Sequence, residues 1–548
     1  MSRLSGARAI TGVLEEAGAG VVFGLPGGQN VALFEALRRS SLRTIVPTSE
    51  LAAGFAAAGF AAASGRPGVL TTIPGPGFAY ALPALAEARL DSLPVVVITV
   101  APREGGIALP LQAFDQAAVA APVVKQVLSA DAEGAAAAVR RALALAVSGE
   151  PGPVLVHVSE QALEARDRDE PSVDAPRAAV AAADVAARLA AAERVVVHVG
   201  GGATGCAEDV VALVERVGAV AISTTSGRGV VPEDHPRSLA VDAPGMGASA
   251  LNELLDRADL VPALGVKYSH NGALGGALRI DPSRFVRVDS SADVLAGAYP
   301  ADTAVEADVP AFLGALLDAL PPEPRPGWPD EDLTRLRPRL DRAGRTRLEP
   351  ALRVAGAEAP ADFFAALRRA LPRDGVLVTD SGLHQQLART HFPVLRPRTL
   401  LVPTDLQSMG FGIPAALGAV AARPGAPVVA LVGDGGLAVS GLELGTAARE
   451  GLPLTVLVFT DRRFTLIRLQ QLARFGQEFG VDTAPLDVER LAGAVGIRYL
   501  RIDADPEPRL REAIASGVPV LAEVLVDEPQ RLGPLRLLGR ARGVRRRL

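Results

Sequence analysis

The sequence has little of what marks secreted, membrane or nucleic-acid-binding proteins. It contains one cysteine, Cys206, which excludes an internal disulfide and fits a reducing compartment. The formal net charge at pH 7 is −5, so no excess of basic residues is present to attract nucleic acid. No uninterrupted apolar run reaches the roughly 20 residues of a membrane-spanning helix. Charged residues interrupt the amphipathic segment 1–20, unlike the apolar core of a signal peptide. We therefore expect a cytoplasmic protein with no membrane and no nucleic-acid partner.

The 548 residues are too many for one hydrophobic core, and their pattern predicts three domains. Short apolar runs alternate with Ala-rich helical stretches in 1–165, 180–320 and 356–530. Such alternation predicts α/β domains, each built on a doubly wound parallel sheet. Residues 321–355 begin with the proline-rich PPEPRPGWP and are expected to form a linker. The basic segment 531–548 is expected to be a solvated tail, with a contact to an anionic partner as the alternative.

One stretch near the C-terminus predicts a binding site. An apolar run at 428–432 ends in a turn made of Gly433, Asp434, Gly435 and Gly436, and a second run at 454–459 ends just before Asp461. In a βαβ unit both turns lie at the same edge of the sheet, where such folds bind ligands. Two carboxylates there suit Mg²⁺, and the glycines let backbone N–H groups approach a phosphate. A tight turn with a solvated aspartate is the alternative for the glycine motif alone.

The N-terminal domain carries a second group of candidate residues. Expected strands at 20–23 and 68–72 run into turns rich in glycine and proline at 24–29 and 74–77. Glu50 precedes an almost entirely small and apolar stretch, which predicts a buried helix with a carboxylate at its N-terminal edge. The plain alternative is that these glycines and prolines only make turns, and that Glu50 only interacts with the helix dipole.

Taken in order, these segments resemble the thiamine-diphosphate-dependent enzymes, in particular the acetolactate synthase and benzoylformate decarboxylase group. The resemblance covers essentially the whole chain and rests on Glu50 followed by AAGFAAAGFAAASGRPG and TTIPGPG, on QSMGFGIPAA, and on the motif that begins with GDG. It implies a pyrimidine-binding, a central and a diphosphate-binding domain, with Mg²⁺ held by Asp434, Asp461 and the backbone carbonyl of Arg463. The family's motif ends in Asn-Asn, where this chain has Thr460-Asp461.

The resemblance also assigns the other site residues. Glu50 would hydrogen-bond the aminopyrimidine ring and act in catalysis, as would Gln112, for which a surface glutamine is the alternative. The carbonyl of Gln407 would accept from the 4′-amino group, and Met409 would hold the cofactor bent. Further cofactor contacts are expected at Gly27, Gly28, Pro74, Gly75, Gly382, Leu383, His384, Gln385, Gly433, Gly435 and Gly436. The substrate pocket is expected to include Gln29, Leu466, Ile467 and Gln470.

The activity implied by the resemblance is decarboxylation of a 2-oxo acid to an enamine, which then adds to a carbonyl acceptor. An oxidase with FAD in the central domain is one alternative, although Gly200–Gly202 lack the GxGxxG spacing of a dinucleotide site. A catalytically weak, cofactor-binding homologue is the other, because Ser49 replaces the usual histidine before Glu50 and Asp461 replaces asparagine. The family builds each site from two chains, which implies a homodimer or a dimer of dimers.

The histidines favour ligation over simple release of an aldehyde. Histidine suits proton donation at neutral pH because its unperturbed pKa is about 6.5. The chain has six histidines, none of them adjoins Glu50, and only His270 is a candidate proton donor. The expected pocket residues Leu466 and Ile467 are apolar, and Gln29 and Gln112 are neutral. The sequence therefore predicts that carboligation predominates when an acceptor is present.

Overall fold

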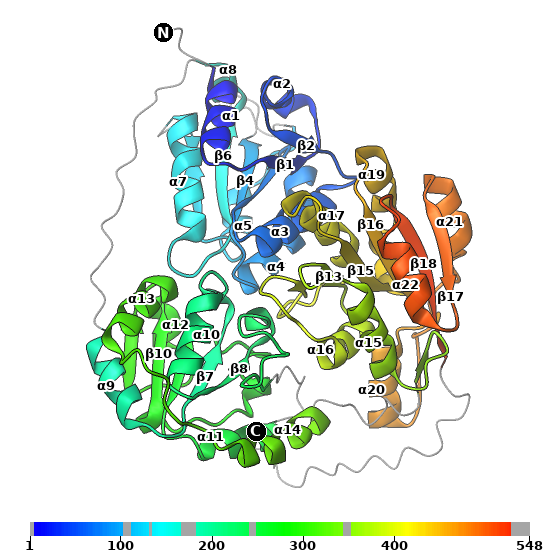
Figure 1. Cartoon of the computed structure of the whole chain (residues 1–548). Helices are drawn as coiled ribbons and strands as arrows, with labels where there is room; N and C mark the ends of the chain where they lie inside the picture. The colour runs from blue at the N-terminus through cyan, green and yellow to red at the C-terminus, as the bar shows by residue number, and fades with distance from the viewer. Residues whose placement is uncertain are drawn as a thin grey trace.

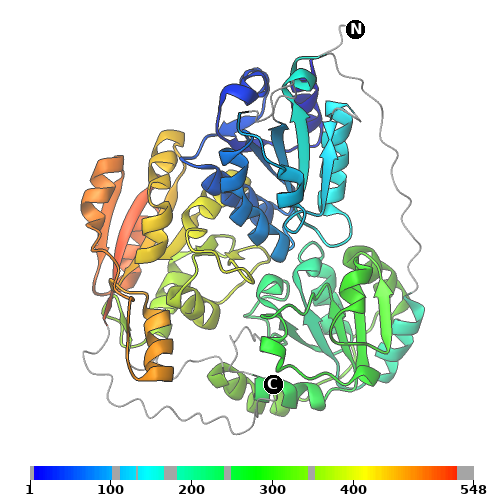
Figure 2. The same ribbon diagram turned by 180° about the vertical axis from the view of Figure 1, so that it is seen from behind.

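The computed structural model describes residues 5–101, 111–130, 134–165, 182–239, 248–343 and 352–527, and it contains three α/β domains (Figure 1). Each domain has one sheet with buried apolar residues on both of its faces, where the helices pack. Figure 2 shows the same three bodies from behind, with the central domain below the N-terminal one. The predicted fold of three doubly wound domains is confirmed.

The N-terminal domain has a six-stranded parallel sheet in the order β2-β1-β3-β4-β6-β5. Its strands are β1 (Val21–Gly24), β2 (Arg43–Ile45), β3 (Gly68–Thr72), β4 (Val95–Ala101), β5 (Gln126–Ser129) and β6 (Val154–Ser159). Its helices are α1 (Gly6–Glu16), α2 (Val31–Arg38), α3 (Glu50–Ser64), α4 (Pro76–Leu90), α5 (Gln116–Ala120), α7 (Ala135–Val147) and α8 (Glu160–Glu164). Because β1 and β3 pair in parallel, with Gly24 opposite Thr71, the turns that follow them lie side by side.

The central domain has a five-stranded parallel sheet in the order β11-β10-β9-β7-β8. Its strands are β7 (Val196–Val199), β8 (Val220–Ser223), β9 (Val261–Leu264), β10 (Phe285–Asp289) and β11 (Thr303–Glu306). Its helices are α9 (Ala183–Ala191), α10 (Ala207–Arg216), α11 (Ala248–Asp256), α12 (Ala292–Ala296), α13 (Val309–Ala319) and α14 (Asp330–Ala343).

Much of the segment predicted as a linker belongs to the central domain instead. Residues 321–355 include α14, which packs on α11, and Trp328, which is 1% exposed in the domain core. The indole N–H of Trp328 donates to the Val195 carbonyl at 2.8 Å. The proline-rich composition indicated an extended chain, whereas burial of this one large aromatic side chain fixes the segment to the sheet.

The C-terminal domain has a sheet in the order β12-β18-β16-β15-β13-β14, with β17 paired to β18, and it is parallel apart from the edge strand β12. Its strands are β12 (Arg353–Val354), β13 (Val376–Thr379), β14 (Leu400–Leu401), β15 (Val428–Gly433), β16 (Leu454–Thr460), β17 (Arg498–Ile502) and β18 (Val520–Asp527). Its helices are α15 (Pro360–Ala370), α16 (Leu383–His391), α17 (Gly412–Ala422), α18 (Asp434–Ser440), α19 (Glu443–Glu450), α20 (Thr465–Phe475), α21 (Val488–Val495) and α22 (Pro506–Ile514). The predicted basic tail, 531–548, lies outside the described residues.

Two helices rich in small residues join the N-terminal and C-terminal domains. The helices α3 and α17 lie side by side at the centre of the molecule (Figure 1). A Cβ added at Gly59 would collide with the Ala415 carbonyl, and one at Gly418 would collide with the Ala56 carbonyl. The two backbones are therefore in direct contact, and one hydrophobic core runs through both domains.

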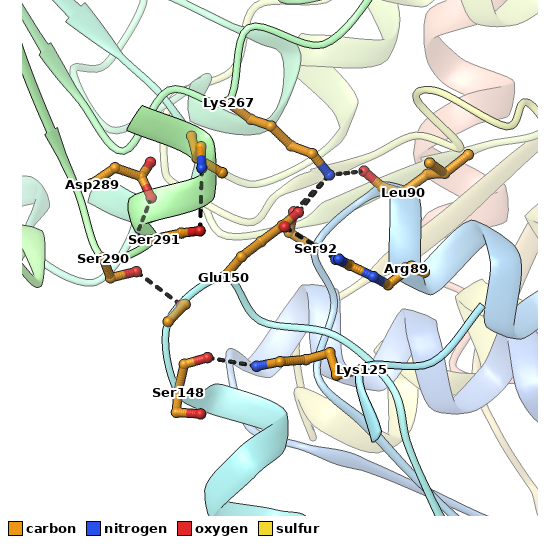
Figure 3. Close-up of polar contacts among 12 residues, drawn as sticks. Arg89, Leu90, Ser92, Lys125, Ser148, Glu150, Lys267, Asp289, Ser290 and Ser291 are labelled. Carbon is orange, nitrogen blue, oxygen red and sulfur yellow. Dashed lines mark hydrogen bonds and ion pairs between the residues drawn. The ribbon is translucent and has the colours of Figure 1, made fainter. Parts of the chain in front are cut away.

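A small polar cluster joins the N-terminal domain to the central one (Figure 3). Glu150 precedes β6, and its carboxylate lies 2.5 Å from Lys267 Nζ and 3.1 Å from Arg89 Nη1. Ser92 also donates to Glu150 at 2.8 Å. Lys267 follows β9, so this carboxylate connects the two domains through a cation of each.

Among the described residues, no helix has both the length and the apolar character needed to cross a membrane.

Candidate active site

Glu50 lies at the start of α3 in a nearly closed environment. Ser49 caps this helix by accepting from the Ala52 N–H at 3.2 Å, so the residue that replaces the usual histidine has a structural role. Glu50 is 8% exposed. A Cβ added at Gly77 would lie 2.8 Å from Glu50 Oε1, which places the carboxylate against the first turn of α4. Within the described part of the chain, the carboxylate has no hydrogen-bond or ion-pair partner.

The turn after β1 and the segment before α5 bring the two candidate glutamines together. Gln29 Nε2 donates to Gln112 Oε1 at 2.5 Å. Gly75 has φ of +67°, and a Cβ on it would lie 2.7 Å from Gln112 Cβ. Gln112 itself has φ of +59°, a conformation that is costly for a residue with a side chain and is common at functional sites. The structure thus places Gln29, Gly75 and Gln112 in one group.

Asn30 shapes the first of these turns and was not among the residues predicted from the sequence. It is fully buried, its Oδ1 accepts from the Gly27 N–H at 2.8 Å, and its Nδ2 donates to the Leu25 carbonyl at 3.0 Å. Asparagine often hydrogen-bonds nearby backbone in turns, and this was the available signal in the sequence.

Asp434 and Asp461 meet at the ends of β15 and β16, as the βαβ pattern predicted. The two strands pair in parallel, with Gly433 opposite Phe459. Asp434 Oδ2 accepts from the backbone N–H groups of Asp461 at 3.1 Å and Arg462 at 2.7 Å. Asp461 accepts from the Arg463 N–H at 3.1 Å and from the Thr465 hydroxyl at 2.6 Å. Burial raises the pKa of Asp434, and burial together with the charge of Asp434 raises the pKa of Asp461 to about 6.

His384 faces the same turn from α16. A Cβ added at Gly433 would lie 3.2 Å from His384 Nδ1, and one at Gly382, which has φ of +148°, would lie 2.8 Å from His384 Cε1. His384 is 6% exposed, and its Nε2 is a buried atom with no hydrogen-bond partner. Burial lowers the pKa of His384 to about 4, so the ring is neutral at pH 7. Gln385 has a different contact, because its Nε2 donates to the Pro403 carbonyl at 2.9 Å.

Met409 and the glycine-rich turn are in contact. A Cβ added at Gly435 would lie 2.8 Å from Met409 Sδ and 2.7 Å from the ring of Phe464, so both side chains cover this glycine.

A second carboxylate group, that of Asp380, lies against the same turn, because a Cβ added at Gly436 would lie 2.8 Å from Asp380 Cγ. Asp380 is fully buried at the end of β13, and sequence reasoning did not identify it as a site residue. Its position at the carboxyl end of a strand was the signal that could have indicated it.

The remaining candidates lie around these two groups. Gly28 and Pro74 are in the turns already described, Leu383 is the first residue of α16, and Gln407 is in the loop before Met409. Leu466, Ile467 and Gln470 lie on α20, with Ile467 46% exposed. Among the described residues, no hydrogen bond or ion pair joins Glu50, Gln29 or Gln112 to Asp434, Asp461 or His384. The predicted residues therefore form two groups, one in the N-terminal and one in the C-terminal domain.

Comparison with known proteins identifies the family. Three models of thiamine pyrophosphate enzymes match the chain: the N-terminal TPP binding domain over 4–121, the central domain over 182–316, and the C-terminal TPP binding domain over 380–524. The large subunit of acetolactate synthase isozyme 2 of Escherichia coli is 31% identical, over 97% of this chain and 97% of that protein. The large subunit of isozyme 1 is 29% identical, over 97% and 96%. The probable 2-ketoarginine decarboxylase AruI of Pseudomonas aeruginosa is 32% identical, over 88% and 86%. The chain belongs to the thiamine pyrophosphate enzyme family.

Proposed function

We propose that the protein is a thiamine-diphosphate-dependent carboligase that decarboxylates a 2-oxo acid and joins the product to a second carbonyl compound, as acetolactate synthases do. The observation that carries this proposal is Glu50, a carboxylate that is 8% exposed and has no partner among the described residues. A buried carboxylate is costly unless it serves a ligand or a reaction. Its place in the N-terminal TPP binding domain supports a role toward the cofactor.

The C-terminal group fits a diphosphate. Gly433 and Gly435 form a strand-to-helix turn at the N-terminus of α18, where backbone N–H groups and the helix dipole favour an anion. His384 Nε2 is buried beside this turn without a partner, and the neutral ring can donate one hydrogen bond. These residues therefore fit the charge and the hydrogen-bonding capacity of thiamine diphosphate.

Mg²⁺ would be held by Asp434, Asp461 and the backbone carbonyl of Arg463. Hard oxygen ligands suit this ion, which commonly completes its shell with phosphate oxygens and water. Two adjacent carboxylates, both with raised pKa values, also favour a divalent cation because it would offset their mutual repulsion. Asp461 supplies an oxygen in place of the family's asparagine and adds a negative charge.

When bound, thiamine diphosphate supplies the nucleophilic carbon that this chemistry needs. The chain's own residues bind, orient and exchange protons. Glu50 would hold a proton against the aminopyrimidine ring, and Met409, which contacts Gly435, would support the cofactor beside the glycine-rich turn. Gln112 and Gln29, which hydrogen-bond each other, would line the substrate side as neutral groups.

The histidines support ligation rather than aldehyde release. Burial lowers the pKa of His157, and it lowers the pKa of His198 and of His384 to about 4. These three rings are therefore neutral at pH 7 and are poor proton donors to a carbanion.

The flavin-oxidase alternative is not favoured, because the relatives described above are named as acetolactate synthases and a decarboxylase. In the central domain, where the oxidase alternative places FAD, the turns after β7 and β9 also pack directly against each other. A Cβ added at Gly202 would lie 2.8 Å from the Gly265 Cα.

A dimer, or a dimer of dimers, would complete the site. The two groups of candidate residues are separate within one chain, and large apolar side chains beside both of them are exposed: Leu111 at 79%, Phe114 at 39%, Met409 at 43% and Ile467 at 46%. Apolar side chains gathered on a surface commonly mark a contact with another chain.

We place the enzyme in the cytoplasm, which suits its single, free and buried Cys206.

The proposal is tested with purified protein, thiamine diphosphate, Mg²⁺ and a panel of 2-oxo acids, each with and without an aldehyde or 2-oxo acid acceptor. We expect CO₂ release and, on chiral chromatography, a ligation product that exceeds free aldehyde. Free aldehyde as the main product with acceptor in excess would contradict the ligase assignment. Tight cofactor binding without CO₂ release from any acid would indicate the catalytically weak homologue.

A further inference from the structure

The loop 404–412, which carries Gln407 and Met409, is held by two buried carboxylates, those of Glu87 and Asp380, and by the half-buried carboxylate of Asp91. Asp380 comes from the same domain as the loop, whereas Glu87 and Asp91 lie at the end of α4 in the N-terminal domain. The backbone donors and their acceptors are Thr404 N–H to Asp91 Oδ2 at 3.0 Å, Asp405 N–H to Asp91 Oδ1 at 3.3 Å, Ser408 N–H to Glu87 Oε2 at 2.9 Å, Gly410 N–H to Asp380 Oδ1 at 3.0 Å, and Gly412 N–H to Asp380 Oδ2 at 2.9 Å. The helix α4 and the C-terminal domain lie side by side in both views (Figures 1 and 2).

The loop needs this support because its own backbone offers little. It runs from the end of β14 to the start of α17 without regular secondary structure. Gln407 has φ of +58°, a conformation that persists in a residue with a side chain only where the surroundings enforce it. Phe411 is buried and fixes the C-terminal end of the loop, but Leu406 and Met409 are 41% and 43% exposed, so burial of apolar side chains does not fix its middle.

The position of the loop sets the position of Met409 over the glycine-rich turn. Met409 Sδ contacts Gly435, the residue next to Asp434. Ser408, whose N–H is held by Glu87, is the residue immediately before Met409 and immediately after Gln407. A change at Glu87 would therefore move both predicted cofactor contacts without altering Asp434, Asp461 or the glycines of the turn.

The two carboxyl groups from α4 are themselves an unusual feature of the fold. Glu87 is fully buried, and its Oε1 has no hydrogen-bond partner. Burial raises the pKa of Glu87, and burial followed by the charge on Glu87 raises the pKa of Asp91. A buried acid beside a second, half-buried acid is costly, and packing alone gives no reason to keep the pair at a domain junction where apolar residues would serve.

We propose that Glu87 and Asp91 are positioning residues of the cofactor site, which act through the backbone of 404–408 to set the places of Gln407 and Met409. This inference rests on the proposed function, because it assumes that Gln407 and Met409 face bound thiamine diphosphate. Each N-terminal domain then contributes twice: it supplies Glu50, and it holds the pyrimidine-supporting loop of its own chain's C-terminal domain.

The test compares Glu87→Leu with Glu87→Gln in the full-length protein with thiamine diphosphate and Mg²⁺. Leucine fills a similar volume but removes the acceptor of the Ser408 N–H, whereas glutamine keeps an acceptor oxygen. Proton exchange at C2 of the bound cofactor is followed by NMR, and cofactor binding is followed by calorimetry. We expect Glu87→Leu to bind the cofactor nearly as well as the parent but to slow C2 exchange by roughly 100-fold, the scale of loss caused by small misplacements at a reacting centre. Glu87→Gln should retain most of the parent rate.

A second variant keeps the test decisive if Glu87→Leu does not fold. Asp91→Asn is nearly isosteric, yet its amide has one acceptor oxygen where the carboxylate has two, so its NH₂ group would face the N–H donor of either Thr404 or Asp405. It should also slow C2 exchange with little change in cofactor binding. Glu150→Gln is the matched control, because Glu150 also connects domains but contacts Lys267 and Arg89 rather than the loop (Figure 3), and its exchange rate should equal the parent's.

The possible failures are distinguishable. A parent protein that does not bind thiamine diphosphate would overturn the proposed function itself. A parent that binds and exchanges normally, together with Glu87→Leu and Asp91→Asn proteins that exchange at the parent rate, would overturn the positioning role alone. The same slowing in Glu150→Gln as in the other variants would show a general effect of domain contacts and would also count against it.

Discussion

The carboxylate of Glu443 on α19 holds Thr48, a residue 395 positions earlier in the chain. Its oxygens accept from the Thr48 backbone N–H at 3.0 Å and from the Thr48 hydroxyl, and the Thr446 hydroxyl donates to it at 2.8 Å. Thr48 lies two residues before Glu50. The C-terminal domain thus fixes the segment that leads into the proposed catalytic carboxylate, just as the N-terminal domain fixes the loop 404–412.

Glu443→Ala should destabilise the protein by about 2–4 kcal/mol, because it removes the charged acceptor of the hydrogen bonds from Thr48 and leaves the buried Thr446 hydroxyl unsatisfied. Glu443 is 1% exposed, so water cannot readily replace the lost oxygens. Thr48→Val, which removes only the hydroxyl donor, should cost about 1 kcal/mol. Denaturant unfolding of both variants checks the order. Equal stability of Glu443→Ala and the parent would show that Thr48 is held by other contacts.

Glu50→Gln should keep the fold and thiamine diphosphate binding but lose most turnover. The amide is the same size as the carboxyl group but cannot take up and release the proton that general acid–base catalysis requires. C2 proton exchange of the bound cofactor, followed by NMR, measures the effect directly. Exchange at the parent rate would remove Glu50 from its proposed role, whatever happens to the overall turnover.

Asp434→Ala should abolish Mg²⁺-dependent binding of thiamine diphosphate, whereas Asp461→Asn should bind and remain active. Asparagine keeps an oxygen ligand and restores the residue usual in the family, and the loss of one of two adjacent negative charges relieves their repulsion. Calorimetric titration with thiamine diphosphate and Mg²⁺ decides between these outcomes. Tight binding by the Asp434→Ala protein is the result that would refute this metal site.

Gly418→Val should destabilise the junction of α3 and α17, because even a Cβ at this position would collide with the Ala56 carbonyl. Overpacking of this kind typically costs about 1–3 kcal/mol, and more where backbone must move. Gly314→Ala is the matched control: Gly314 lies inside α13, and an added Cβ would meet nothing within 4 Å. It should stabilise by roughly 0.5–1 kcal/mol through helix propensity. Thermal unfolding of the two proteins should shift in opposite directions.

Asp380 should make stability depend on pH. Burial raises its pKa to about 6, above the value of about 3.9 expected in the unfolded chain. The folded protein therefore binds more protons between these values, so the contribution of Asp380 is greatest below pH 4 and falls as the pH rises to 6. The free energy of unfolding of the parent, minus that of Asp380→Asn, should fall by roughly 3 kcal/mol over this range and then stay level. A difference that rises with pH would reverse the assignment.

The helices, the strands and the motifs of the candidate site could be predicted from the sequence alone. Apolar runs such as 428–432 and 454–459 are strands because a strand covered on both faces needs continuous apolar residues. The turns that follow them carry Asp434 and Asp461 to one sheet edge because parallel neighbours end together. The order of the motifs was enough to indicate the family, and the comparisons confirmed it. The assigned roles of Glu50, Gln112 and Met409 remain predictions.

The groups that hold those motifs in place could not be predicted from the sequence, because they depend on the packing of distant segments. Glu87 and Ser408 are 321 positions apart, and Glu443 and Thr48 are 395 apart, so no local periodicity relates them. Their contacts exist because α3 and α17 bring two domains together through backbones that only small residues allow to touch. The same reason explains why the prediction of a linker at 321–355 was wrong. The composition of this segment is typical of a linker, but Trp328 is buried in a position that exists only once the central sheet has formed. Residue types and short spacings encode strands and motifs, whereas burial between distant segments is set by how whole domains pack.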